Sequence, residues 1–406
     1  MKKIILLLSV LFLYSCENQP ATYQLEEGNW RLVLDLGSGK QLPVNVIVNK
    51  DQSITIKNAS EEIVVTEVSI KQDSIFIQPP VFEGVFKGKF ESKNLITGVH
   101  IKPSLDRVVP FKMLANKAAR FENVSSKPVV KNITGSYETV FSPNNDTDRY
   151  IAKGVFTQTG NQVTGTFETT TGDYRFLEGI VTNDSLKLST FDGAHAFLFE
   201  AAITDSTIIG DFYSGNHWKE PFQARLNNNY ELPDAKELTY LKEGYDTIEF
   251  SFKNVDGEVV SINDSEFQNQ VVIVQLLGTW CPNCLEETRF YQEYLNQQNN
   301  DVKFIGLAFE YARSEKAAMN SIQRLIKSED ITYPILLAQY GTTDKTTANE
   351  KLPMLNHVLS YPTSIYIDKT GKVRRIHTGY NGLATGSKHE RFQQEFYSFI
   401  EELLAE

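Results

Sequence analysis

The chain has 406 residues and a formal net charge of −11 at pH 7. This length predicts two or three domains, and an acidic chain without basic runs argues against nucleic acid as a partner. Its three cysteines are Cys16, Cys281 and Cys284. Modification of Cys16 would leave a single thiol pair, which in an oxidising compartment favours a catalytic role over a structural one.

The N-terminus predicts export. Two lysines precede an apolar run over residues 4–13 that is too short for a transmembrane helix and is typical of a signal peptide, expected over residues 1–15. Leu-Tyr-Ser-Cys at residues 13–16 resembles the bacterial lipobox, where the signal is cut before a cysteine that is then acylated. We therefore predict lipidation of Cys16, a tether over residues 16–22, and a location on the periplasmic side of a bacterial membrane. Ordinary cleavage elsewhere, leaving Cys16 removed or free, is the alternative.

The pattern from Tyr23 to Leu226 is β throughout. Short runs that alternate apolar and polar residues recur between polar turns. Examples are residues 44–48, 54–56, 73–77 and 163–167. The pattern predicts an all-β antiparallel region, built as a barrel or a sandwich, without a convincing helical segment.

Four landmarks of this region recur in the same order at nearly constant spacing. They are Gly28-Asn29-Trp30 with Gly135-Ser136-Tyr137, Asp73-Ser74-Ile75 with Asp184-Ser185-Leu186, Ile96-Thr97-Gly98 with Ile208-Ile209-Gly210, and Pro110-Phe111 with Pro221-Phe222. The recurrence predicts an internal duplication, with β unit 1 over residues 23–121 and β unit 2 over residues 122–228. Turn sequences that β-rich segments share by chance are the alternative.

The pattern changes after a polar linker predicted over residues 229–240. Strands are predicted at residues 247–253, 258–262, 271–277, 302–309, 333–337, 363–368 and 372–378, and helices at 282–298, 314–327, 343–355 and 388–404. Strands separated by helices, closed by a hairpin and a last helix, predict an α/β domain over residues 241–406.

The Trp-Cys-Pro-Asn-Cys motif at residues 280–284 contains two cysteines placed for reversible thiol–disulfide exchange. It follows the apolar run at 271–277 and opens a predicted helix. At a helix N-terminus, unpaired N–H groups favour a thiolate on Cys281, while Cys284, one turn further in, can attack a mixed disulfide. We expect Cys281 to face solvent and Cys284 to be shielded. Zinc binding is the alternative, but the six histidines are scattered without the pair spacing that zinc sites use.

The string Gly-Thr-Trp-Cys-Pro-Asn-Cys at residues 278–284 resembles the thioredoxin fold. More narrowly, it is similar to the TlpA/ResA-type thiol–disulfide oxidoreductases, and the resemblance covers about residues 235–406. It implies that Cys281 is the attacking thiolate, that Cys284 is the resolving thiol, and that the dithiol works without a further cofactor. It also implies that Trp280 flanks the pair and shapes the face that meets a substrate. An ordinary buried aromatic is the alternative for Trp280.

Tyr361-Pro362-Thr363 matches the family's cis-proline position. We therefore expect a cis peptide bond before Pro362, close to the cysteines, with Tyr361 and Thr363 beside an extended substrate segment. A trans proline at the start of a strand is the alternative.

Glu287 lies one helical turn after Cys284, where TlpA/ResA-type proteins often carry a glutamate. The resemblance implies that this carboxylate accepts or delivers the proton of the buried thiol. The alternative is a solvent-facing side chain beside Glu286. Thioredoxin has a buried acid where this chain has Gln275, which cannot carry a proton, so that task would fall to Glu287 or to water.

The leading hypothesis is an extracytoplasmic, membrane-anchored reductase of protein disulfides, supplied with electrons by a membrane thiol donor. Relatives of this type are often linked to cytochrome c maturation, so those components are candidate partners. A peroxidase is disfavoured because the peroxiredoxin string that precedes the nucleophile is missing here. A hypothesis of a different functional class is a binding lipoprotein whose β region captures a ligand or partner. Trp30, Trp218, Tyr213 and the many phenylalanines of the β region could line its pocket, although a β-sheet core needs aromatic residues too and that interpretation is favoured. Replacing both Cys281 and Cys284 by Ala would distinguish the enzyme from the binding lipoprotein. The enzyme would lose its activity, whereas the binding lipoprotein would still bind its ligand.

Overall fold

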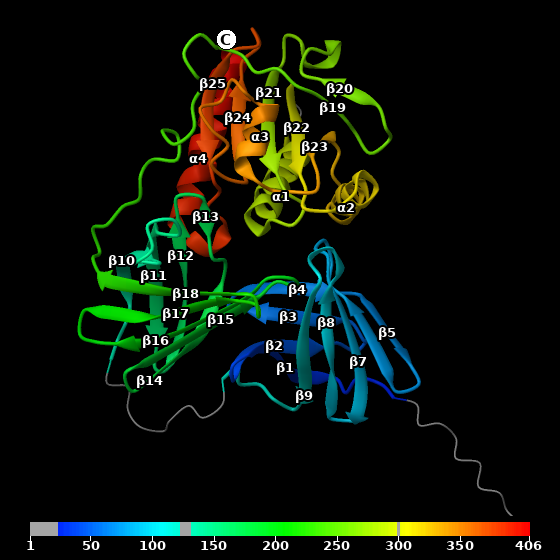
Figure 1. Ribbon diagram of the computed structural model, residues 1–406, viewed down its shortest axis with the longest axis vertical. Helices are drawn as coiled ribbons and strands as arrows, with labels where there is room; N and C mark the ends of the chain where they lie inside the picture. The colour runs from blue at the N-terminus through cyan, green and yellow to red at the C-terminus, as the bar shows by residue number, and fades with distance from the viewer. Residues whose placement is uncertain (1–22, 122–130, 299–300) are drawn as a thin grey trace, which may run out of the picture.

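A computed structural model describes residues 23–121, 131–298 and 301–406. These residues form three β-sheets, one in each predicted β unit and one in the α/β domain (Figure 1). The predicted signal peptide over residues 1–15, the tether over 16–22 and the lipidation site Cys16 lie outside the described residues. Within the described residues, no helix has the length and apolarity needed to cross a membrane.

β unit 1 is an antiparallel sheet of nine strands. They are β1 (Gly28–Gly37), β2 (Lys40–Val48), β3 (Ile54–Asn58), β4 (Glu61–Val65), β5 (Glu67–Lys71), β6 (Ser74–Gln78), β7 (Val85–Ser92), β8 (Leu95–Lys102) and β9 (Arg107–Ala115), with a short 3₁₀ turn at Pro103–Leu105. The first strand pairs with the last, so β4 and β5 are the edge strands. Alternate residues face the core, as Val109, Phe111 and Met113 do on β9.

β unit 2 closes on itself. Its strands are β10 (Gly135–Phe141), β11 (Tyr150–Thr159), β12 (Gln162–Thr169), β13 (Gly172–Asp173), β14 (Leu177–Thr182), β15 (Ser185–Phe191), β16 (Ala196–Ile203), β17 (Thr207–Ser214) and β18 (Trp218–Leu226). Pairing of β11 with both β10 and β12 completes a ring, here called the barrel. Its interior is filled by fully buried phenylalanines, including Phe141, Phe167, Phe199 and Phe222, and closure removes the exposed strand edges.

The two β units share strand register as well as strand order. Trp30 pairs with Ala115 across β1 and β9, and the matching landmark Tyr137 pairs with Leu226 across β10 and β18. Each of the four predicted landmark pairs lies on equivalent strands of the two sheets. These registers agree with the predicted internal duplication. They also show two separate sheets, not one large closed sheet.

The α/β domain contains a mixed seven-stranded sheet in the order β20-β19-β23-β22-β21-β24-β25. Its elements are β19 (Ser251–Lys253), β20 (Val259–Ser261), β21 (Val271–Leu277), α1 (Pro282–Gln297), β22 (Val302–Phe309), α2 (Glu315–Ser328), β23 (Ile335–Gln339), α3 (Lys345–Lys351), β24 (Thr363–Ile367), β25 (Val373–Thr378) and α4 (Ser387–Ala405), with 3₁₀ turns at Ser265–Phe267 and Leu383–Thr385. All seven residues of β21, which lies between β22 and β24 inside the sheet, are buried, as its apolar run predicts. Most of the predicted strands and helices of this domain begin and end within a few residues of the observed ones, although β19, β20 and α3 are shorter than predicted.

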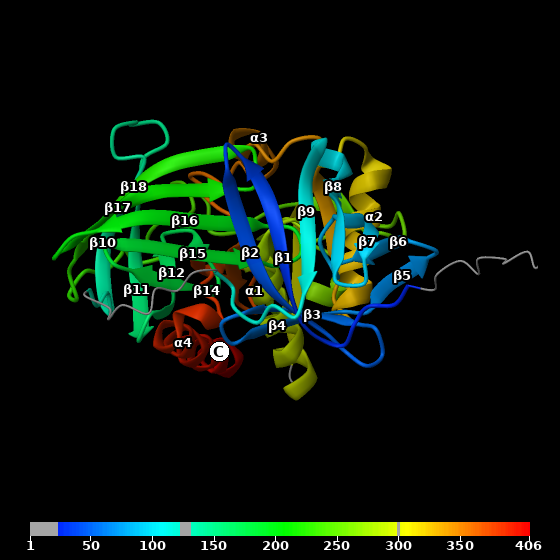
Figure 2. The same ribbon diagram turned by 90° about the horizontal axis from the view of Figure 1, so that it is seen from below.

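The two β units pack against each other, side by side in Figure 2. Asn58 at the end of β3 makes two hydrogen bonds with the backbone of Phe191 at the end of β15. Its amide donates to the Phe191 carbonyl at 2.9 Å, and its oxygen accepts from the Phe191 N–H at 3.1 Å. Arg120 is buried at the same interface and donates to Ser189 Oγ at 3.0 Å and to the Pro43 carbonyl at 3.2 Å. Because these buried polar groups are paired, the interface specifies one orientation of the two units.

Gly210 on β17 lies so close to the neighbouring strand β16 that a larger residue should not fit there. A Cβ atom at Gly210 on β17 would lie 2.1 Å from the Glu200 carbonyl oxygen on β16. We expect Gly210→Ala to lower the free energy of unfolding by about 2 kcal/mol or more, because the strands must separate. A urea titration measures the change. Ile209→Ala, the neighbouring residue on the same strand and 48% exposed, is the control and should cost less than about 0.5 kcal/mol. Equal stability of the two variants would contradict this packing.

Candidate active site

The two cysteines of the motif form a disulfide at the start of α1. Their Cα atoms are 5.2 Å apart, and Cys281 is the N-cap residue, with the Cys284 N–H donating to Cys281 Sγ at 3.2 Å. Pro282 occupies the first turn, where its missing N–H costs nothing. Cys284 is 1% exposed, as expected, but Cys281 is only 5% exposed. The prediction that Cys281 faces solvent is therefore wrong, because residues from the barrel lie against the motif.

The loop before β24 lies beside the disulfide. The Tyr361–Pro362 peptide bond is cis, as expected, and Cys281 Sγ lies 3.4 Å from the Tyr361 carbonyl oxygen. Thr363 is fully buried and donates to the Ser360 carbonyl at 2.9 Å. Trp280 is partly buried, its indole N–H donates to the Phe309 carbonyl at 2.9 Å, and its ring meets the Tyr361 ring edge to face. Tyr361 therefore contacts the Cys281 sulfur, whereas the buried Thr363 side chain stabilises the loop through its hydrogen bond to Ser360.

Glu287 is fully buried on α1. Its carboxylate accepts from Gln275 Nε2 at 2.8 Å, and from the hydroxyls of Tyr291 and Ser364 at 3.0 Å each. Burial raises the pKa of Glu287 from 4.5 to about 7, against the opposing effect of these hydrogen bonds. Gln275 also donates to the Cys284 carbonyl at 3.2 Å, so it links the carboxyl to the resolving cysteine. The alternative of a solvent-facing Glu287 is wrong.

A second buried carboxyl, Glu310, was not predicted. It follows β22 directly and accepts from the Thr279 N–H at 2.7 Å and from the Thr279 hydroxyl at 2.8 Å, two residues before Cys281. Burial raises the pKa of Glu310 to about 7, while the hydrogen bonds from Thr279 oppose the rise. The sequence contained a signal for this residue, because Glu310 directly follows the predicted buried strand 302–309. Functional sites of parallel sheets form at the carboxyl ends of the strands.

The β12–β13 hairpin of the barrel contacts the motif directly. With its side-chain amide oriented to satisfy both groups, Asn283 accepts from the Asp173 N–H at 2.7 Å and donates to the Asp173 carbonyl at 3.3 Å. The Thr171 carbonyl accepts from Ser360 Oγ at 3.3 Å. A Cβ atom at Gly172 would lie 1.7 Å from the Asn283 amide, so the fit requires glycine there. One hairpin therefore contacts both the motif and the proline loop.

Arg175, just beyond this hairpin, joins all three units. It is 3% exposed and has a left-handed backbone conformation with φ of 57°. Its guanidinium forms ion pairs with Glu286 on α1, at 2.9 Å, and with Glu61 on β4. It also donates to the Pro282 carbonyl at 3.4 Å. Burial and the neighbouring Glu286 raise the pKa of Asp173 beside it. Sequence reasoning missed this cluster, since no motif marks it.

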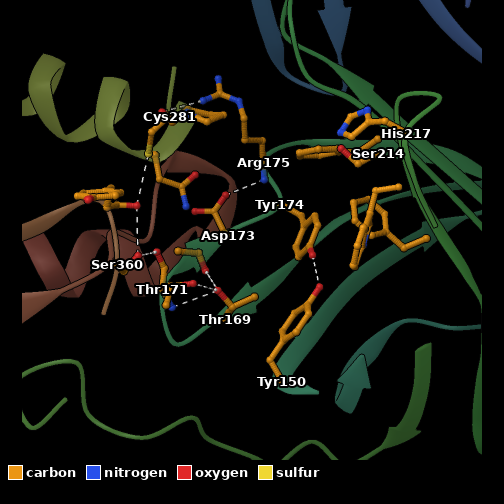
Figure 3. Close-up of a pocket in the computed structure, with 17 residues that line it drawn as sticks. Tyr150, Thr169, Thr171, Asp173, Tyr174, Arg175, Ser214, His217, Cys281 and Ser360 are labelled. Carbon is orange, nitrogen blue, oxygen red and sulfur yellow. Dashed lines mark hydrogen bonds between the residues drawn. The ribbon is translucent and has the colours of Figure 1, made fainter. Parts of the chain in front are cut away.

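A pocket of about 540 Å³ lies between one end of the barrel and the motif, beside these direct contacts (Figure 3). Cys281, Pro282 and Asn283 line one side, together with the loop at residues 360–361. The other side is formed by one end of the barrel, where residues of β11, β12, β16, β17 and β18 meet. Cys281 thus lies on a cavity that two domains build together.

Comparisons with known proteins agree with this geometry. The Redoxin family model matches residues 231–389. The chain is 28% identical over 153 residues to thioredoxin-like protein YneN of Bacillus subtilis, covering 37% of this chain and 80% of that protein. It is 24% identical over 131 residues to sporulation thiol-disulfide oxidoreductase A of Bacillus subtilis, covering 32% and 70% of the two chains. The C-terminal domain is a thioredoxin-like thiol–disulfide oxidoreductase domain, similar to the TlpA/ResA type.

Solved structures similar to this oxidoreductase domain include a thiol-disulfide oxidoreductase from Bacteroides fragilis. It is 20% identical, with 36% of this chain and 99% of that chain covered and a TM-score of 0.27. StoA from Bacillus subtilis is 20% identical, with 38% and 97% covered and a TM-score of 0.25. The family match begins at residue 231, so the β units lie outside it.

The raised pKa of Glu287 predicts a pH dependence of stability in the oxidoreductase domain. The folded state holds this proton more tightly than the unfolded chain, so its contribution to stability is present below pH 4.5 and is lost as the pH rises through about 7. In the unsubstituted protein, this carboxyl should lower the free energy of unfolding by about 3 kcal/mol as the pH rises from ~4 to ~8. We expect Glu287→Gln to abolish this decrease. Urea titrations at both pH values measure it.

Glu293→Gln is the matched control, because Glu293 is an exposed carboxyl on the same helix. This variant should keep the pH dependence of the unsubstituted protein. If Glu287→Gln keeps it as well, the carboxyl does not hold its proton in the way that its burial implies.

Proposed function

We propose that the chain is an extracytoplasmic, membrane-anchored reductase of protein disulfides. The observation that carries the chemistry is the Cys281–Cys284 pair at the N-terminus of α1, beside the Tyr361 carbonyl. The oxidoreductases named ResA and sporulation thiol-disulfide oxidoreductase A are similar to this chain. Support for export and for a lipid anchor at Cys16 comes from the signal-like N-terminus and its lipobox-like end.

The reaction begins with the reduced pair. A Cys281 thiolate accepts the Cys284 N–H that lies 3.2 Å from its sulfur, whereas a neutral Cys281 thiol can donate to the Tyr361 carbonyl at 3.4 Å. The thiolate attacks one sulfur of a substrate disulfide, so that a mixed disulfide forms while the substrate S–S bond breaks. The departing substrate sulfur leaves as a thiolate and takes up a proton.

The second step returns the enzyme to the disulfide state seen in the structure. Cys284 loses its proton and attacks the Cys281 sulfur, which releases the substrate as a dithiol. Two electrons have then passed from the enzyme to the substrate, and a dithiol donor must restore the pair. Glu287, tied to Cys284 through Gln275, holds or releases a proton near neutral pH while this thiol titrates.

The β region belongs to the same site in this proposal. Cys281 lines a pocket whose other side is formed by the barrel, so substrate capture and exchange would take place in one cavity.

The reduction potential of the Cys281–Cys284 couple tests the proposed direction of electron flow. Equilibration of the purified protein with a dithiothreitol redox buffer, followed by thiol trapping, gives the value. We expect a potential near the ~−270 mV of thioredoxin, as a reductant requires. A value near the ~−120 mV of DsbA would mean that the protein oxidises its substrates. If Cys281 and Cys284 form no reversible redox couple, the proposal that the protein is an oxidoreductase is wrong.

A further inference from the structure

Cys281 is largely buried. The residue is 5% exposed, and it lies on the pocket shared by the barrel and the oxidoreductase domain. Thiol–disulfide exchange requires the incoming sulfur to touch the attacking sulfur. A substrate disulfide must therefore enter this pocket, or the barrel must move away from the motif.

The contacts of the β12–β13 hairpin favour a fixed wall over a movable cover. Asn283 pairs with both backbone groups of Asp173, and Arg175 is held by carboxylates of two other units. A further ion pair joins Glu168 at the end of β12 to Lys388 on α4, at 3.0 Å. Opening the hairpin would break these ion pairs and hydrogen bonds together, so the contacts oppose a movable cover.

The barrel side of the pocket includes a cluster of aromatic side chains. Tyr174, Phe197 and Phe212 contact one another with ring centroids 5.1 to 5.6 Å apart. Trp218 at the start of β18 also lines the pocket and remains 44% exposed, so its ring is accessible to a ligand there. The Arg175 charge on this wall is already balanced by Glu61 and Glu286. Asp173, Ser214 and His217 line the pocket as well, so the aromatic cluster is the part of the wall that suits a neutral, apolar group.

We propose that the barrel selects the substrate of the redox site. Its aromatic end binds the aromatic or large aliphatic side chain next to the reacting cysteine of an extended peptide segment, while the disulfide of that segment meets Cys281. A volume of about 540 Å³ holds a few side chains but not a folded domain. This inference rests on the proposed disulfide exchange and follows the same two steps.

The test compares two short linear peptides, each as its disulfide-linked dimer, that differ only in Phe or Ser beside the cysteine. The reduced full-length protein reacts with each, and quenched-flow sampling with mass spectrometry gives the rate constants. We expect the Phe peptide to react at least about tenfold faster, as burial of one large apolar side chain allows. Trp218→Ala should reduce this ratio to about threefold or less, and Trp218→Phe should retain most of it.

Phe76→Ala is the matched control, since Phe76 is an aromatic residue of β6 that is 39% exposed in β unit 1. It should keep the full ratio. Equal rates for the two peptides, or an unchanged ratio in Trp218→Ala, would overturn the inference. A compact folded protein disulfide that reacts as fast as the Phe peptide would also overturn it and would indicate movement of the hairpin. Failure of even hydroxyethyl disulfide to react would instead overturn the proposed function.

Discussion

The burial of one arginine at the junction of three units is the constraint on which the active-site geometry depends. Arg175 forms ion pairs with Glu61 of β unit 1 and with Glu286 of the oxidoreductase domain, and it donates to the Pro282 carbonyl. Removing a guanidinium from water carries a desolvation cost that only close carboxylates offset, and loss of one partner of such a pair typically costs about 3–5 kcal/mol. The cluster thus holds the three units in one relative placement.

That placement changes the surroundings of the redox motif. In an isolated oxidoreductase domain, the Pro282 carbonyl and the Asn283 amide would meet solvent. Here they bond to the barrel, which approaches so closely that Gly172 leaves no room for a Cβ atom. The sulfur of Cys281 therefore faces a cavity with one wall from each domain. A duplicated β region, one copy of which is a closed barrel, contributes directly to the site in this way.

The sequence predicted what depends on local signals. The apolar runs of β21 and β22 have the bounds that were expected, and the cis peptide bond at Pro362 follows from the family motif. Burial of Glu287 could not be decided, because its position in the helix fits either face. Contacts between units were missed, since Arg175 and Glu61 are 114 residues apart and no periodicity relates them. The exposure of Cys281 was wrongly predicted for the same reason: the covering hairpin belongs to another domain.

The most direct test of this account is the reactivity of the reduced Cys281 thiol toward reagents of different size. In a Cys284→Ser variant, the rate constants of Cys281 with iodoacetamide and with a maleimide attached to a folded protein are measured, with the modified residue mapped by mass spectrometry. Their ratio is compared with that of a free cysteine peptide. We expect Cys281 to disfavour the bulky reagent by at least about tenfold more than the peptide does. An equal ratio would show that the barrel does not restrict the site, and would contradict the account.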